Sequence, residues 1–157
     1  MKNQTYAMKY TEGNEGGFRK YPYVDTKGYH TIGVGHKLPG PPSEDLKRFG
    51  ISRIKGLLQF KEDYGIAIED ARAGFPNFDT LPAEAQMVLV DMAFNMGEGS
   101  DRRKTGLEGF DNMQAAISRR DFNEAAWQIL DSGYAKEDVP RRAIKNALIL
   151  RGVRDEY

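Results

Sequence analysis

The stretch "EGNEGGFRKYPYVDTKGYHTIGVGH", residues 12–36, decides the fold. From Phe18 to His36 it is rich in aromatic, β-branched and glycine residues, which are typical of short strands. Residues 25–28 (DTKG) form a turn signal between two strand-like runs. The stretch therefore predicts a small antiparallel sheet of two or three strands. It also carries two Glu-Gly pairs, at Glu12 and Glu15, upstream of Asp25.

Outside this stretch the sequence pattern is mainly helical. The residues before Gly13 predict a short helix that this glycine ends, because glycine readily takes the left-handed conformation at a helix C-terminus. Ser43 is expected to cap a second short helix that ends near Gly50. Apolar spacing predicts further helices at about 52–73, 83–96, 108–119, 123–131 and 140–151.

These elements predict an α+β protein with a single domain over residues 1–157. We expect a β-containing lobe at about 13–55, a connecting helix at about 57–74 and a helical lobe at about 75–157. The N-terminal helix is expected to pack with the helical lobe. A cleft between two such lobes is a common place for a ligand.

Composition excludes several classes of function. The 157 residues have a formal net charge of zero, so the chain lacks the basic field that non-specific nucleic-acid binding needs. There are no cysteines, which rules out disulfides and thiolate chemistry. His30 and His36 lack partners at metal-binding spacing, and we expect neither a metal nor another cofactor. The N-terminus has no apolar run like that of a signal peptide, and no window is long enough for a membrane span.

The remaining candidates for chemistry are carboxylates. A glutamate at a helix end and an aspartate at a strand turn would bring two carboxyl groups to one junction. Paired carboxylates are the usual equipment of glycosidases, with about 6.5–9.5 Å between them in inverting enzymes. Spacing alone does not distinguish such a pair from ordinary surface charges.

Four segments together make the chain resemble a known family. "EG…YPYVDTKGYHTIGVGH" is similar to the signature of the phage-type lysozymes, glycoside hydrolase family 24. "FKEDYGIAIEDA" resembles their interlobe helix, and "MAFNMGE" resembles their buried central helix. "DFNEAAWQILDS" followed by "VPRRAIKNALILRG" is similar to their last helices. The likeness covers nearly the whole chain and implies a lysozyme-like α+β fold.

The resemblance implies hydrolysis, with inversion, of the β-1,4 bond between N-acetylmuramic acid and N-acetylglucosamine in peptidoglycan. A glutamate before the first glycine would be the general acid, Asp25 would activate a water, and Thr31 would help to hold it. Arg142 matches an arginine that reaches the acid from the helical lobe. His36 and Asp63 match a structural ion pair. Phe94 matches an aromatic at the floor of the cleft, where a plain core role is an equal alternative.

The opening stretch departs from the family pattern. Glu15 lies ten residues before Asp25, one more than the pattern, and Glu12 lies thirteen before it. Counting gaps favours Glu15. Helix reasoning favours Glu12, because apolar residues precede it and Gly13 follows it directly, whereas Gly13 and Asn14 make a poor helix end before Glu15. We therefore expect Glu12 to be the acid and to meet Arg142, with Glu15 as the alternative. The segment after His36 is also shorter than in the family.

The leading functional hypothesis is an endolysin that waits in the host cytoplasm and reaches the wall through a membrane pore made by another protein. Its partners would be peptidoglycan glycan strands, with no nucleic acid and no stable membrane insertion, and it would act as a monomer. Two alternatives are a lytic transglycosylase, which forms an anhydro ring instead of adding water, and a catalytically silent peptidoglycan-binding module.

Overall fold

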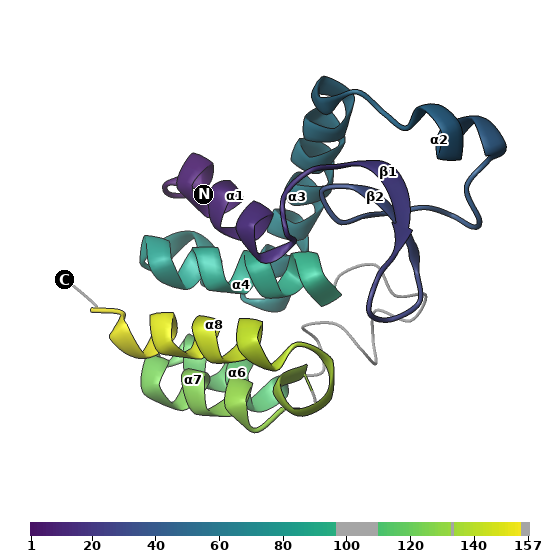
Figure 1. The fold of residues 1–157 in the computed structure, drawn as a ribbon. Helices are drawn as coiled ribbons and strands as arrows, with labels where there is room; N and C mark the ends of the chain where they lie inside the picture. The colour runs from purple at the N-terminus through teal and green to yellow at the C-terminus, as the bar shows by residue number, and fades with distance from the viewer. Residues whose placement is uncertain (97–109, 133, 155–157) are drawn as a thin grey trace. The chain divides into compact units, whose positions relative to one another are not determined.

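The computed structural model describes residues 1–96, 110–132 and 134–154 (Figure 1). Within these residues the chain is mainly helical and carries one small antiparallel sheet, so the predicted α+β class is confirmed. The chain divides into two compact units, one of residues Met8–Gly65 and the other of Met1–Ala7 with Ile66–Tyr157. We call them the sheet unit and the helical unit and describe each by itself.

The sheet unit contains three strands, β1 (Arg19–Val24), β2 (His30–Gly33) and β3 (His36–Lys37), in the order β1-β2-β3. All neighbours are antiparallel, as the sequence predicts. Between Arg19 and Tyr23 the pairing with β2 is irregular, because four residue steps on β1 face two on β2. Pro22 lies in this irregular part, where its missing N–H costs the sheet no ladder hydrogen bond.

The end of helix α1 differs from the sequence prediction. The helix runs over Gln4–Asn14, so Gly13 lies inside it and does not stop it. The backbone N–H of Gly17 donates to the carbonyl of Glu12, and that of Gly16 donates to Gly13. This pair of hydrogen bonds, with Gly16 at a left-handed φ of 83°, is the Schellman arrangement that ends helices. Glu15 is therefore the last residue before the left-handed glycine.

Two further helices belong wholly or partly to the sheet unit. Helix α2 (Glu44–Phe49) begins after Ser43, whose hydroxyl accepts from Leu46 N, and ends at Gly50, as predicted. Helix α3 (Arg53–Gly74) is one unbroken helix, and the division between the two units falls within it. Gly56 is where Phe18 packs against the helix, and a Cβ at this position would overlap the Phe18 ring. Close packing thus explains a glycine that weakens the helix by propensity alone.

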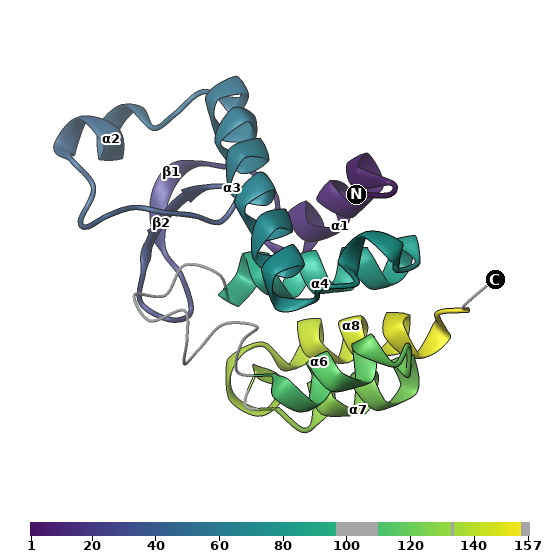
Figure 2. The ribbon, with the colours of Figure 1, turned by 180° about the vertical axis from the view of Figure 1, so that it is seen from behind.

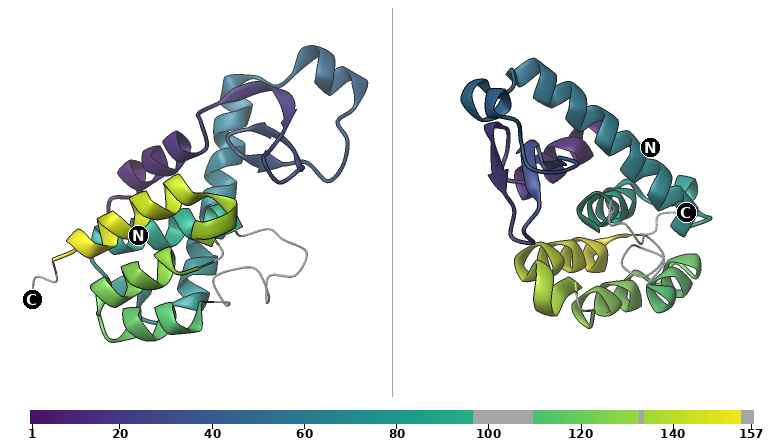
Figure 3. Two further views of the ribbon diagram at one scale, coloured as in Figure 1. Left: turned by 60° about the horizontal axis from the view of Figure 1, so that its bottom comes forward. Right: turned by 90° about the vertical axis from the view of Figure 1, so that its right-hand side faces the viewer.

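The helical unit continues with the single turn η1 (Phe78–Thr80) and helix α4 (Ala83–Met96). Helix α4 is the centre of its core, since nearly every residue from Ala85 to Ala93 is buried. Around it lie α6 (Asp111–Ser118), α7 (Phe122–Leu130), the π-helical turn η3 (Tyr134–Asp138) and α8 (Pro140–Gly152) (Figure 2). Helices α6, α7 and α8 lie side by side in both views of Figure 3.

The helices of this unit largely match the expected ranges. The first residues of the helix expected at 108–119 lie outside the described residues. Helix α6, which lies in the described part of this range, ends at Ser118. Among the described residues, none of the helices combines the length and the apolar character required to cross a membrane.

Candidate functional site

Asp25 is fixed by the turn that joins β1 to β2. Its Oδ1 accepts hydrogen bonds from the backbone N–H groups of Lys27 (2.9 Å) and Tyr29 (2.8 Å). The turn is closed by Gly28 N, which donates to the Asp25 carbonyl and lies at a φ of 87°. Because the turn uses Oδ1, the Asp25 carboxylate keeps Oδ2 for a further acceptor role.

Thr31 lies on β2, where its side chain is buried. It is the direct cross-strand partner of Tyr23, so the two side chains project from the same face of the sheet. Alternation along β1 brings Asp25, two residues after Tyr23, to that face as well. The Thr31 hydroxyl donates to the Tyr29 carbonyl at 2.8 Å. A hydroxyl has one proton, and that of Thr31 is used in this hydrogen bond. The Thr31 oxygen can therefore only accept in any further hydrogen bond.

Glu15 is held at the junction of α1 with the sheet. A Cβ at Gly35 would lie 2.5 Å from Glu15 Oε2, so the carboxylate rests against the backbone of Gly35 in the turn between β2 and β3. Glu12 lies one turn earlier, inside α1. The argument from helix ending that favours Glu12 is therefore wrong, because Gly16 and not Gly13 ends the helix.

Tyr23, which no motif in the sequence singles out, lies near Glu15 and Asp25. Burial raises the pKa of its phenol, and the negative charges of Glu15 and Asp25 raise it further, against an opposing effect of Arg19. The Arg19 guanidinium carbon lies 4.2 Å from the centroid of the Tyr23 ring. Strand alternation before Asp25 is the only sequence signal that could have suggested Tyr23. Nothing local suggests Arg19, because the irregular pairing of β1 brings it there.

His36 and Asp63 are in direct contact within the sheet unit. His36 Nδ1 lies 2.8 Å from Asp63 Oδ2, and Gln59 Nε2 donates to Asp63 Oδ1 at 3.3 Å. The contact ties the start of β3 to helix α3. Both residues belong to the sheet unit.

Arg142 lies in the helical unit, in a buried polar cluster. Its Nε and one terminal nitrogen donate to the two carboxylate oxygens of Asp91 at 2.9 and 2.8 Å. Asn146 Nδ2 also donates to Asp91, at 2.9 Å. Asp91 is fully buried and is not among the residues predicted from the sequence, although a charged residue within the apolar run "VLVDMAF" indicates a buried partner. The contact of Arg142 with the acid remains a prediction.

Phe94 lies on α4 and is partly exposed, whereas its neighbours Met92 and Ala93 are buried. Its position on the helix fits both a core role and a surface contact. The predicted role at the floor of a cleft stays a prediction.

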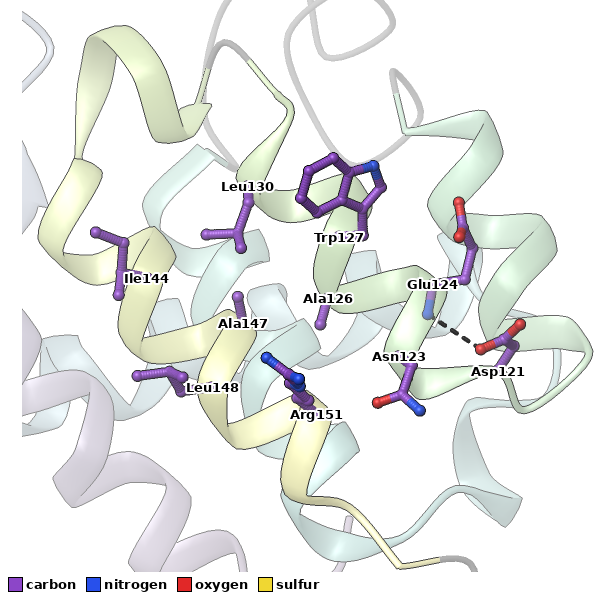
Figure 4. Close-up of a pocket in the computed structure, with 10 residues that line it drawn as sticks. All are labelled: Asp121, Asn123, Glu124, Ala126, Trp127, Leu130, Ile144, Ala147, Leu148 and Arg151. Carbon is purple, nitrogen blue, oxygen red and sulfur yellow. Dashed lines mark hydrogen bonds between the residues drawn. The ribbon is translucent and has the colours of Figure 1, made fainter.

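The helical unit also carries a surface groove of about 600 Å³ between α7 and α8 (Figure 4). Its apolar walls include Trp127, Leu130, Ile144 and Leu148, all of which are exposed. Figure 4 shows that helices α7 and α8 supply these walls, and that the residues predicted to act in catalysis are not among them. Within the described part of the chain, His, Asp and Glu do not gather into a set of three that could bind a metal ion.

Comparison with known proteins supports the resemblance. The family model for phage lysozyme matches residues 13–142, most of the 157-residue chain. The chain is also similar to the pre-baseplate central spike protein Gp5 of Enterobacteria phage T4, with 26% identity over 175 aligned positions. That alignment covers 99% of this chain and 29% of Gp5, so the chain spans less than a third of this relative's length. The chain belongs to the phage lysozyme family.

Proposed function

We propose that this chain is a lysozyme that hydrolyses the β-1,4 bond between N-acetylmuramic acid and N-acetylglucosamine in peptidoglycan. Membership of the phage lysozyme family supports a lysozyme-type peptidoglycan hydrolase. The proposal assigns the general acid to Glu15, and the positioning of the attacking water to Asp25 and Thr31. The observation that carries it is the cross-strand pair of Tyr23 and Thr31, with Glu15 and Asp25 both close enough to act on the Tyr23 phenol.

The hydrogen bonds around Asp25 and Thr31 support the role of holding a water. Oδ2 of the ionised Asp25 can only accept and is not used by the turn, and the Thr31 oxygen can only accept because its proton goes to the Tyr29 carbonyl. A water that donates one proton to each of them has its lone pairs turned away, toward a substrate. Asp25 could then take a proton from this water as it attacks the anomeric carbon.

Three observations support Glu15, rather than Glu12, as the acid. Glu15 immediately precedes the left-handed Gly16 that ends α1, which reproduces the family pattern of a Glu-Gly pair at a helix end. Its carboxylate rests against Gly35 of the "TIGVGH" motif. The match to the family model begins at residue 13, after Glu12 and before Glu15. A rigid helix end also fixes an acid more firmly than a loop would.

The reaction follows from these roles. Glu15 in its protonated form would give its proton to the oxygen of the leaving sugar, while the water attacks from the opposite face and inverts the anomeric carbon. The transition state carries positive charge at that carbon, which the ionised Asp25 would stabilise. We further propose that Arg142 pairs with the acid and that Phe94 contacts substrate, both by resemblance to the family.

Digestion of purified peptidoglycan in water labelled with ¹⁸O tests the reaction type. Hydrolysis predicts muropeptides with one labelled oxygen at the new reducing end, and Asp25→Asn should abolish their release. Products lighter by one water would indicate an anhydro ring and a transglycosylase. Binding to the wall without any product would indicate a silent binding module.

The biological role that we propose is lysis of the host at the end of infection, with a separate pore giving access to the wall. The relative in phage T4 is a central spike protein, which favours a second candidate, action as part of a virion spike. Producing the protein in bacteria with and without a pore-forming partner separates the two. Lysis that depends on the pore supports the first candidate, and recovery of the protein in purified particles supports the second.

A further inference from the structure

The Tyr23 hydroxyl is a hydrogen-bond donor on the face that carries the proposed catalytic groups. Tyr23 lies directly opposite Thr31 in the sheet and two residues before Asp25. The charges of Glu15 and Asp25 both act on its phenol, so the phenol lies near the proposed acid and near the residue proposed to activate water. These relations all fall within the sheet unit.

Arg19 fixes the orientation of this ring. Its guanidinium lies 4.2 Å from the ring centroid, a distance typical of a cation–π contact. The pairing of β1 with β2 is irregular between Arg19 and Tyr23, so the contact spans the irregular part of the strand. The contact with Arg19 restricts the rotamers of Tyr23 before any ligand binds. Less conformational entropy is therefore lost when its hydroxyl binds a ligand.

The hydroxyl is also available as a donor. A tyrosine phenol is protonated throughout the neutral range, and burial together with the two carboxylates raises its pKa further. Among the described residues, none accepts a hydrogen bond from it. A half-buried donor that no described residue accepts from, beside the two carboxylates proposed to act on a glycosidic bond, is suited to an acceptor on the sugar.

We propose that the Tyr23 hydroxyl donates a hydrogen bond to an oxygen of the sugar bound between Glu15 and Asp25, and that Arg19 is the residue that positions Tyr23. The inference rests on the proposed function, because it takes the substrate to be a glycan held by these carboxylates. Tyr23 thereby becomes a determinant of substrate placement in addition to the Glu15, Asp25 and Thr31 set.

The first test is kinetic and compares Tyr23→Phe with Tyr21→Phe. Tyr21 is a matched control on the same strand, half exposed and stacked on Lys20 at 5.4 Å. With a soluble peptidoglycan tetrasaccharide, Tyr23→Phe should lower kcat/KM about three- to tenfold, the usual effect of one lost hydrogen bond. Tyr21→Phe should match the wild type, and melting temperatures should be equal. Equal kcat/KM for the two variants would overturn the inference.

The second test is spectroscopic and observes the Tyr23 phenol itself. Ultraviolet titration of the phenol is followed in the Glu15→Gln protein, which should not cleave the tetrasaccharide, and Glu15→Gln/Tyr23→Phe serves as the blank. Donation to the sugar stabilises the protonated phenol, so saturating tetrasaccharide should raise the pKa of Tyr23. An unchanged or lowered pKa would contradict the inference.

Failure of the inference can be told apart from failure of the proposed function. If Glu15→Gln remains active, the acid is misassigned and the proposed function in its present form fails. If Glu15→Gln is inactive but Tyr23→Phe behaves like Tyr21→Phe, only the role of Tyr23 is wrong.

Discussion

The space for the Glu15 carboxylate depends on Gly35, a residue without a side chain. Gly35 has a φ of 64°, which other residues rarely adopt, and a Cβ there would meet the carboxylate. The second glycine of "TIGVGH" therefore makes room for the proposed acid in addition to forming the turn. It links a sequence motif to the placement of a residue about twenty positions earlier.

Gly35→Ala should impair both folding and activity. A left-handed φ costs an alanine about 1–2 kcal/mol, and the added methyl group would push the Glu15 carboxylate away from its place. We expect chemical denaturation to show a loss of stability of this size, and peptidoglycan clearing to fall by more than the loss of folded protein explains. Gly40→Ala is the control, since Gly40 has no atom within 4 Å of its added Cβ and no left-handed φ. Equal activity of the two variants would show that activity does not depend on the space that Gly35 leaves for Glu15.

The pKa of the Tyr23 phenol should report which glutamate lies beside it. A neighbouring negative charge opposes formation of the phenolate and so raises the pKa, and removal of that charge should lower it. Difference titration against Tyr23→Phe should therefore show a lower Tyr23 pKa in Glu15→Gln and in Asp25→Asn. Glu12→Gln should leave it unchanged. A lower Tyr23 pKa in Glu12→Gln but not in Glu15→Gln would mean that Glu12, and not Glu15, lies beside Tyr23.

At the scale of elements, the end of α1 sets the position of Glu15, the proposed acid. Gly13 and Gly16 are both preceded by a glutamate, yet only Gly16 has the left-handed backbone. Gly13 lies in the helix with no atom within 4 Å of an added Cβ. The two glycines are therefore equivalent in sequence and opposite in structural role.

Replacement of each glycine by alanine should have opposite effects on stability. Gly13→Ala should raise it by up to about 1 kcal/mol, because alanine is the better helix former in a helix interior. Gly16→Ala should lower it by about 1–2 kcal/mol through its left-handed φ. Urea unfolding of the two variants measures both. If Gly13→Ala destabilises the protein and Gly16→Ala does not, the helix ends at Gly13, as the sequence predicts.

The elements differ in how far the sequence predicts them, and the reason is physical. Helices α2 and α4 match their expected bounds because Ser43, Gly50 and Pro82 are local signals that act within one turn. The end of α1 was predicted wrongly because both Glu-Gly pairs satisfy the same local rule. The choice between them depends on where the chain must leave the helix for Arg19 to pair with Gly33. That is a long-range constraint, and local propensity carries no information on it.

The same limit applies to the candidate site. Asp25 could be predicted at a turn and Thr31 on a strand, since the turn signal and strand pattern around them are local. Tyr23 and Arg19 could not be predicted, because the register of β1 and its irregular pairing decide which side chains meet. Asp91 belongs to the same class: its apolar surroundings indicate a buried partner, but only packing identifies that partner as Arg142.

At the scale of the whole molecule, the two units contribute different things. The residues of the proposed catalytic face, from Glu15 to Thr31, all belong to the sheet unit. The helical unit supplies the larger apolar core and the buried cluster of Asp91, Arg142 and Asn146. A buried guanidinium needs its partner, because an unpaired buried charge is strongly unfavourable.

Asp91→Ala should therefore be among the most destabilising single changes in the helical unit. Removal of one partner of a buried ion pair costs about 3–5 kcal/mol. Asp79→Ala is the control, because Asp79 pairs with Arg72 at an exposed site and should leave the melting temperature nearly unchanged. Calorimetry of both variants measures the difference. A small and equal effect in both would mean that the cluster does not stabilise the unit.

We propose above that Glu15 is the general acid of a glycosidase. The most direct measurement compares Glu12→Gln and Glu15→Gln in the release of muropeptides from purified peptidoglycan, with circular dichroism and melting temperature showing that both are folded. We predict that Glu15→Gln loses activity by two or more orders of magnitude, as loss of a general acid does, while Glu12→Gln keeps most of it. An inactive but folded Glu12→Gln beside an active Glu15→Gln would contradict the account.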